Sequence, residues 1–209
     1  MLKLYRKGTY YRSSRAYGVS ADGSVVVGWS EGSAFRWTAS GEMQYLGGGS
    51  YSEAFGVSAD GSVVVGVSSN GRAFRWENGV LQSLDTPYPL GSRAYGVSAD
   101  GSVVVGSAVG SSPTAALRWT AARGWGWEDL NMTYTLWTYP SELYEARAIS
   151  PDGRYIVGWG RNAATNRFEA FLLDTRLQRC APDGDVNCDG IVDDADLLIV
   201  LFNFGNRYR

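Results

Sequence analysis

Short apolar runs alternate with polar, glycine-containing turns along most of this chain, and the alternation repeats with a period of about 40 residues. The most regular segment is Gly-Val-Ser-Ala-Asp-Gly-Ser-Val-Val-Val-Gly, which occurs unchanged at 18–28, 56–66 and 96–106. A looser fourth copy runs from Ala148 to Gly158. A period of this size predicts a stack or ring of equivalent structural units.

Each copy predicts four short antiparallel strands. The segment before the Ala-Asp-Gly turn, such as 16–20, forms the first strand, and the turn residues tolerate the left-handed backbone of a tight hairpin. The Ser-Val-Val-Val run forms a second strand, whose unbroken β-branched residues indicate burial on both faces. A variable loop leads to a third strand, marked by Ala-Phe-Arg-Trp, and a short turn leads to a fourth, such as 80–84. The third strands fall at 34–37, 73–76, 116–119 and 170–173.

Four antiparallel strands per repeat predict an all-β fold, a β-propeller of about four four-stranded blades. We expect this domain to occupy residues 1–176, with repeats starting near 16, 54, 94 and 146. The last repeat has no convincing fourth strand, and residues 2–11 could supply one and close the ring within the chain. The alternatives are that the chain is a fragment of a larger ring, or that it dimerises to complete one.

The repeated residues resemble the HAF-type extracellular repeat, a bacterial family with Gly-x-Ser-x-Asp-Gly-x-x-x-Val-Gly followed by Ala-Phe-x-Trp. Four copies carry the resemblance, which covers roughly residues 16–174. It implies secretion and a propeller-like fold, and it implies little about activity. The segment Ser20-Ala-Asp22-Gly23 is also similar to the Asp-box of sialidases, although the spacing departs from that motif and no matching arginine cluster is identifiable.

The composition excludes several kinds of chemistry. The chain contains no histidine, which excludes Ser-His-Asp catalysis and imidazole acid–base chemistry. A formal net charge of −2 gives no basic footprint for nucleic acid. No apolar run approaches the roughly 20 residues that span a bilayer. The first 15 residues are too polar for a signal peptide. Either the protein stays inside the cell or this is a mature or truncated form, and we prefer the second interpretation.

The C-terminal segment, residues 177–209, carries a different signal. From Asp185 to Asp196, oxygen-bearing side chains stand at positions 1, 3, 5, 9 and 12 of a twelve-residue loop, with Gly190 at position 6. This is the pattern of an EF-hand-type calcium loop, in which the glycine permits the sharp turn and the residue after it offers its carbonyl. An apolar stretch, 197–204, predicts the helix that follows.

The same segment resembles one half of a type I dockerin over about residues 183–206. The resemblance implies a calcium ion held by Asp185, Asn187, Asp189, the Ile191 carbonyl, Asp193 and Asp196. A dockerin contains two such halves and this chain carries one, so a cohesin-like partner or a second dockerin half is a further expectation. Cys180 and Cys188 are either a local disulfide bracing this loop or free thiols. Millimolar extracellular calcium suits even a weak site.

The predicted topology also indicates a binding surface. The loops between second and third strands and the segments between blades share one end of the propeller, and both vary in sequence. Exposed aromatic side chains among polar groups suit sugar rings or peptides, although they could instead pack between blades, as we expect for Trp37, Trp76 and Trp119. The candidates on this surface are Trp29, Glu31, Tyr51, Tyr88, Trp137, Tyr139, Trp159 and Arg161.

These observations predict a secreted or cell-surface, non-enzymatic binding or scaffold propeller with a calcium-binding attachment tail. It would act in extracellular adhesion or polysaccharide-related assembly, with a protein or a carbohydrate at the variable loops. The alternative is a glycan-active lyase or hydrolase that uses carboxylates on the same surface, among them Glu31, Glu53, Glu142 and Glu145. A scaffold without any ligand is a third interpretation.

Overall fold

The computed structural model describes residues 13–40, 43–110 and 114–176. The chain divides into two units, Met1–Leu173 and Asp174–Arg209, and the account below concerns the first. The predicted calcium loop, the two cysteines and the proposed closing strand at 2–11 lie outside the described residues. No helix in the described part of the chain is long and apolar enough to cross a membrane.

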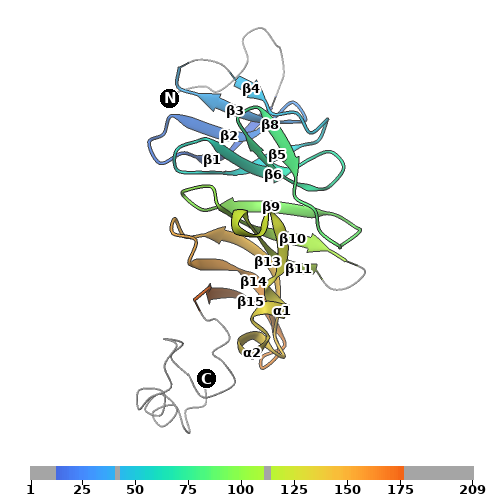
Figure 1. The fold of residues 1–209 in the computed structure, drawn as a ribbon. Coiled ribbons are helices and arrows are strands. Elements are labelled where there is room, and N and C mark those ends of the chain that lie inside the picture. Colours follow the sequence, from blue (N-terminus) through green and yellow to red (C-terminus); the bar gives the residue numbers. More distant parts are fainter. Residues whose placement is uncertain (1–12, 41–42, 111–113, 177–209) are drawn as a thin grey trace. The chain divides into compact units, whose positions relative to one another are not determined.

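The described residues form four antiparallel sheets, in each of which the strands are ordered as in the chain (Figure 1). The first sheet contains β1 (Ser14–Val19), β2 (Val25–Ser30), β3 (Ser33–Thr38) and β4 (Met43–Tyr45). The second contains β5 (Glu53–Val57), β6 (Val63–Val67), β7 (Ala73–Glu77) and β8 (Val80–Ser83). The third contains β9 (Ser92–Val97), β10 (Val103–Val109), β11 (Thr114–Thr120) and β12 (Gly126–Asp129). The fourth contains β13 (Glu142–Ile149), β14 (Tyr155–Asn162) and β15 (Arg167–Asp174).

Each sheet corresponds to one sequence repeat, so the predicted all-β propeller architecture is confirmed. Among the described residues the fourth sheet has three strands, in agreement with the lack of a fourth-strand pattern directly after 170–173. A short 3-10 turn (Ala121–Arg123) lies between β11 and β12, and the segment between the last two sheets contains α1 (Leu130–Thr133) and α2 (Thr135–Thr138). The Asp129 carboxylate caps α1 by accepting a hydrogen bond from the Asn131 amide at 2.8 Å.

The sheets pack face to face in chain order, each against the next, and apolar side chains fill the spaces between them. Between the first two sheets the core includes Val25, Val27, Ala54, Val64, Phe74 and Trp76. Between the second and third it includes Val63, Val65, Leu84, Val104, Leu117 and Trp119. The two central third-strand tryptophans therefore pack between blades, as expected. The Trp119 indole also donates to the Asp85 carbonyl at 3.2 Å.

A row of stacked side chains joins the first strands of all four sheets. The rings of Tyr17 and Phe55 have centroids 5.6 Å apart, and those of Phe55 and Tyr95 are 5.5 Å apart. In the fourth repeat this position is Arg147, whose guanidinium carbon lies 4.3 Å from the centroid of the Tyr95 ring. The repeated sequence positions thus become neighbours across three successive junctions.

Candidate functional site

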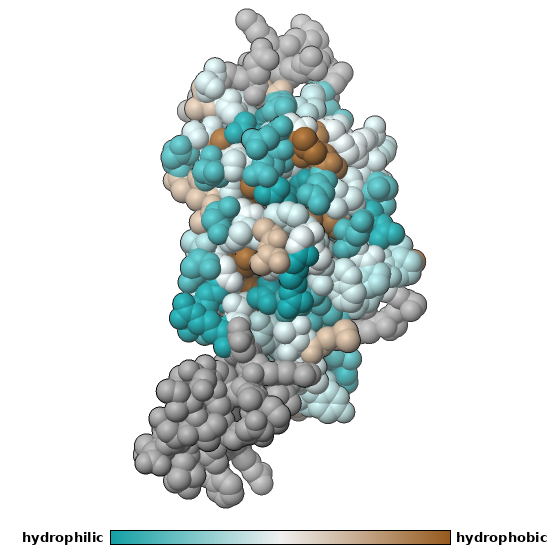
Figure 2. All heavy atoms as spheres, viewed as in Figure 1, coloured by the Kyte–Doolittle hydropathy of each residue, from teal (hydrophilic) through white to brown (hydrophobic). Residues whose placement is uncertain are grey.

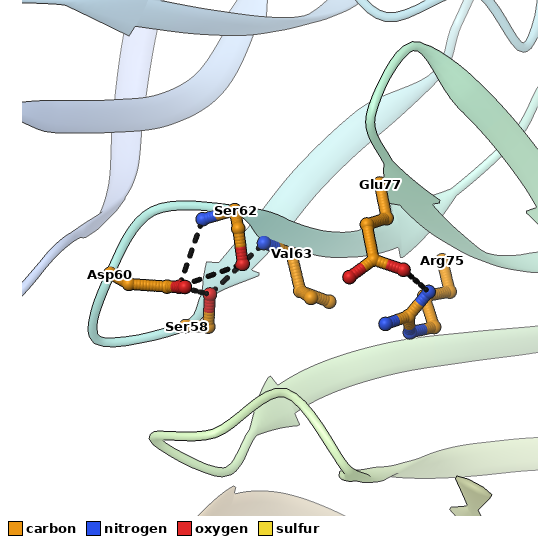
Figure 3. A network of polar contacts seen from close by, with 6 residues as sticks. All are labelled: Ser58, Asp60, Ser62, Val63, Arg75 and Glu77. Atoms are coloured by element: carbon orange, nitrogen blue, oxygen red, sulfur yellow. Dashed lines mark hydrogen bonds and ion pairs between the residues drawn. The ribbon is translucent and has the colours of Figure 1, made fainter.

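The Ser-Ala-Asp-Gly turns define one end of the sheets, called here the turn end. In the second repeat the Asp60 carboxylate accepts hydrogen bonds from the Ser58 hydroxyl at 2.6 Å and from the Ser62 amide at 3.0 Å. The Ser58 hydroxyl oxygen in turn accepts from the Val63 amide at 3.0 Å, which starts the next strand (Figure 3). The serine and aspartate therefore close the hairpin.

The same network recurs at Asp22, Asp100 and Asp152. Hydrogen bonds from the neighbouring serines lower the pKa of Asp60, and the Ser24 amide with the Ser20 hydroxyl does the same for Asp22, each to about 2. The pKa of Asp100 is lowered for the same reason. These carboxylates are ionised at neutral pH and are occupied by their own turns, so their regular spacing serves folding of the hairpins.

Backbone hydrogen bonds link each turn to the next one in the series of four sheets. The Ala21 amide donates to the Ala59 carbonyl at 2.9 Å, and the Ala59 amide donates to the Ala99 carbonyl at 3.0 Å. The Ala99 amide then donates to the Pro151 carbonyl at 2.9 Å. The turn end is therefore a continuous hydrogen-bonded strip across four sheets.

The opposite end, called here the linker end, combines the loops between second and third strands with the segments between sheets, as predicted. The Ser69 amide in the β6–β7 turn donates to the Gly48 carbonyl of the preceding linker at 2.7 Å. The Ser92 amide after the next linker donates to the Gly71 carbonyl at 2.8 Å. The hydroxyls of Ser52 and Ser92 also accept from the Ala34 and Ala73 amides, so backbone bonds and this recurring serine hold the linkers while most of their other side chains differ between repeats.

Two predicted tyrosines stand out from the linker end. Tyr51 is 83% exposed and has a left-handed backbone with φ of 71°, and its amide donates to the Gly32 carbonyl. Tyr139 is 80% exposed and precedes Pro140 across a cis peptide bond. The predicted residue Trp137 lies in α2, and its side chain falls outside the described atoms. Figure 2 shows that the visible surface is mainly polar or neutral, with apolar residues in small separate patches.

Two further candidates from the linker loops have structural partners. Glu31, in the β2–β3 turn with φ of 56°, accepts a hydrogen bond from the Tyr45 hydroxyl at 3.4 Å. The Tyr88 hydroxyl donates to the Asp129 carboxylate at 2.6 Å, and its half-buried ring packs against the core between the second and third sheets. Burial, with the hydrogen bond to Asp129, raises the pKa of Tyr88 to about 12. Tyr88 therefore braces a linker.

Three candidates that we expected in loops lie on strands instead, because β2 and β14 extend further than the apolar runs suggested. Trp29 is half-buried on β2, with the Arg15 guanidinium 5.8 Å from its ring centroid. Trp159 lies on β14, where its indole donates to the Glu145 carboxylate at 2.9 Å. Arg161, also on β14, donates to the Asn166 side chain at 2.9 Å.

The carboxylates considered for catalysis are likewise placed on the sheets. Glu142 and Glu145 belong to β13, although we had assigned both to a loop. Glu142 accepts from the Tyr144 hydroxyl at 2.7 Å, and Glu145 forms an ion pair with Arg147. Glu53 begins β5. Within the described ranges, no group of three acidic or cysteine side chains is arranged to hold a metal ion.

Sequence reasoning missed the partners of two third-strand arginines, Arg118 and Arg75, which do not share one junction: Leu117 and Trp119 face the second sheet, so Arg118 between them lies on the other face of the third sheet. Arg118 on β11 pairs with Glu128 on β12 at 2.7 Å, and the Glu128 side chain is almost fully buried. The Arg75 guanidinium carbon lies 4.3 Å from the ring centroid of Trp125. The arginine of the Ala-Phe-Arg-Trp motif was the available signal, since the same residue recurs in three repeats at an interior strand.

A small depression also lies at the linker end, with a volume of about 180 Å³. Its lining residues are Gly71, Leu90, Gly91, Ser92, Arg93, Ser107 and Val109. Two backbone hydrogen bonds between Leu90, Gly91 and Val109 form one of its walls. The lining contains one charged side chain, Arg93, and no carboxylate pair. The depression therefore does not provide the acid and base of a hydrolase.

Comparison with known proteins supports the fold. No protein-family model matches the chain, and no curated protein matches it. The structure is similar to TolB from Acinetobacter baumannii, with a TM-score of 0.56 and 12% identity over 79% of this chain and 42% of that chain. It is also similar to a putative TolB from Agrobacterium tumefaciens, with a TM-score of 0.56 and 17% identity over 78% of this chain and 58% of that chain.

The chain thus spans about half the length of these two solved structures. They are propeller-type folds, in agreement with the sheets described above. At such low identity the similarity establishes the fold alone.

Proposed function

We propose that this protein is a non-enzymatic binding propeller whose linker end contacts an extracellular polysaccharide. The observation that carries the proposal is the exposure of Tyr51 and Tyr139 on two different linkers, at 83% and 80%. Such rings stack on sugar faces at low entropic cost, because a tyrosine side chain has only two rotatable bonds. A polymer can contact several linkers at once, which suits aromatic groups distributed over separate blades.

The difference between the two ends of the sheets supports this choice of surface. At the turn end, the recurring aspartates are held by hydrogen bonds within their own turns. At the linker end, the loop sequences differ between repeats while their backbones are held. A fixed scaffold with variable loops is a common basis for recognition.

Affinity electrophoresis tests the proposal directly. The full chain is run through gels that each contain one polysaccharide, such as xylan, mixed-linkage β-glucan or galactan, and its retardation is measured. We expect retardation by at least one polymer, and we expect Tyr51→Ala combined with Tyr139→Ala to abolish it. The matched control is Val80→Ala, which removes an apolar side chain that is 67% exposed at the start of β8, at the turn end. Equal mobility of the wild type in every gel, or equal retardation of the double variant, would refute the proposal.

The C-terminal segment adds a second element to the proposed function. We infer from its sequence that Asp185, Asn187, Asp189, the Ile191 carbonyl, Asp193 and Asp196 bind one calcium ion and create an attachment module. Calorimetric titration of the full chain with calcium should give one site. Asp185→Ala should remove it, whereas Asp183→Ala, a neighbouring carboxylate outside the twelve-residue loop, should leave it unchanged. Equal calcium binding by the wild type and Asp185→Ala would contradict this assignment.

A further inference from the structure

The two outermost sheets carry apolar faces that the inner sheets bury. Val27, Val65 and Val105 occupy equivalent positions on the second strands of the first three sheets and are completely buried, at 0% exposure. Their counterpart in the fourth sheet, Val157, is 41% exposed. At the other end of the series Val19 is 60% exposed, whereas its counterparts Val57 and Val97 are half-buried against neighbouring sheets.

The outward face of the fourth sheet is strongly apolar. Three aromatic side chains form a cluster on it, with ring centroids 5.5 Å apart for Tyr144 and Trp159 and 5.9 Å apart for Trp159 and Phe168. Leu172 on β15 is 69% exposed on the same face and stands where the earlier repeats have arginine. An apolar sheet face of this kind is typical of an interaction surface.

The first strands show which surface would complement that face. One position of the first strand, directly before its conserved alanine, carries a charge in every repeat and pairs with the second strand of the same sheet. The residues there are Arg15, Glu53, Arg93 and Glu145, so the sign of the charge alternates from sheet to sheet. A further sheet that carried Arg15 at this position would continue the alternation after Glu145. The row of stacked side chains on the first strands begins with Tyr17 and ends with Arg147, which stacks on Tyr95. Tyr17 of a further sheet would place an aromatic ring next to Arg147.

The first sheet retains the features that receive a preceding sheet. In the second and third sheets, the turn glycines Gly61 and Gly101 lie directly against a valine of the preceding sheet. A Cβ added to Gly61 would stand 2.3 Å from the Val25 side chain, and one added to Gly101 would stand 2.6 Å from the Val63 side chain. The equivalent Gly23 has nothing within 4 Å of that position. The Ala21 carbonyl, whose counterparts Ala59 and Ala99 accept inter-sheet hydrogen bonds, accepts none within the described residues.

The fourth sheet matches this receiving surface incompletely. Pro151 replaces the alanine whose amide donates in the earlier turns, and proline has no N–H to donate. Tyr155 replaces the valine that packs on the next turn glycine. A junction between the fourth and first sheets would therefore keep the apolar contacts and the alternation of charge, and would lose the backbone hydrogen bond of the turn. It would be weaker than the three junctions within the chain.

We propose that two copies of this chain associate head to tail, the fourth sheet of each copy packing on the first sheet of the other. The result is one closed ring of eight sheets, within the range of about four to eight blades that propellers adopt. Three copies would exceed that range. Every receiving face is filled, so the assembly stops at two chains.

Sedimentation equilibrium of the full chain tests the association. We expect the mass of two chains at high concentration and a shift toward one chain on dilution. Val19→Asp should give the mass of one chain, because it introduces an unpaired charge into an apolar junction. Leu172→Asp should do the same from the opposite side of that junction. The control is Val80→Asp, an exposed valine at the turn end, which should keep the wild-type mass. Circular dichroism and thermal unfolding establish that each variant is folded.

A mixing experiment distinguishes head-to-tail packing from symmetric pairing of identical sheets. Mixed Val19→Asp and Leu172→Asp chains retain one intact junction, formed by the fourth sheet of the first variant and the first sheet of the second. We expect the mixture to regain a population with the mass of two chains, with a dissociation constant below that of either variant alone. Wild type that stays at one chain at every concentration would overturn the proposal. So would a dimer that persists in either single variant, or a mixture that fails to associate.

Discussion

The turn end and the linker end are built from the same repeats, yet they use their side chains differently. At the turn end, Ser58 and Asp60 satisfy backbone groups, and equivalent residues do so in each repeat. At the linker end, backbone bonds such as that between Ser69 and Gly48 and the buried hydroxyl of Ser52 hold the loops, while other side chains, such as Tyr51, extend into solvent. The residues that recur in every repeat therefore stabilise the fold, whereas the residues that vary between repeats are available for recognition. Substitutions of the turn serines and aspartates should therefore be costly, and substitutions of the exposed linker side chains should be tolerated.

The largest effect is expected where a turn glycine meets the preceding sheet. Gly61→Ala places a Cβ 2.3 Å from the Val25 side chain and imposes a side chain on a φ of +74°. Together, overpacking and left-handed strain should lower the free energy of unfolding by about 3 kcal/mol, as measured in urea. The matched control is Gly71→Ala in the same sheet, with a φ of +74° and no neighbour within 4 Å. It should cost about 1 kcal/mol, and equal costs for the two variants would contradict the packing argument.

The next effect concerns the serine of the turn. Ser58→Ala leaves the buried Val63 amide without the hydroxyl oxygen that it donates to, so the free energy of unfolding should fall by about 2 kcal/mol. Ser69→Ala, in the β6–β7 turn at the linker end, changes a serine whose backbone amide makes the inter-loop bond and should be nearly neutral. Chemical denaturation of both variants compares the two ends directly, and a larger loss from Ser69→Ala would reverse the comparison.

A smaller effect should appear in the pH dependence of stability. The folded pKa of Asp60 is about 2, below its ordinary 3.8, so its hydrogen bonds stabilise the fold fully above pH 3.8 and progressively less as the pH falls toward 2. Asp22 contributes with the same sign. Thermal unfolding between pH 5 and 2 should show a steeper loss for the wild type than for a variant with Asp22→Asn, Asp60→Asn and Asp100→Asn. Parallel curves would show that these turns do not carry the acid sensitivity.

The smallest effect on stability should come from the proposed binding residues. Tyr139→Ala removes a side chain that is 80% exposed and should change the free energy of unfolding by less than about 0.5 kcal/mol. The same variant should weaken the polysaccharide retardation described above. A large loss of stability would indicate that the ring packs on the protein surface, and would remove Tyr139 from the recognition surface.

The repeats made the fold predictable, because local turn chemistry and the β-branched runs agree with the same architecture in every copy. Trp76 and Trp119 were placed between blades by their recurrence alone. The candidate site was less predictable, because loop residues acquire partners that are distant in sequence. Tyr88 looked like a ligand contact, yet its hydroxyl is held by Asp129, 41 positions away. Trp159 and Arg161 looked like loop residues because nothing in the local pattern marks where β14 ends.

The strip of hydrogen bonds from Ala21 to Pro151 has a consequence for how the chain unfolds. Each sheet is made of consecutive hairpins and bonds only to the sheets beside it, so unfolding need not be all-or-none. Within the described part of one chain, the fourth sheet packs against one other sheet and the third packs against two. The amides of β14 should therefore exchange with solvent hydrogen faster, by local unfolding of the last sheet. The amides of β6 and β10 should exchange more slowly, because their sheets open only when the neighbouring sheets unfold as well.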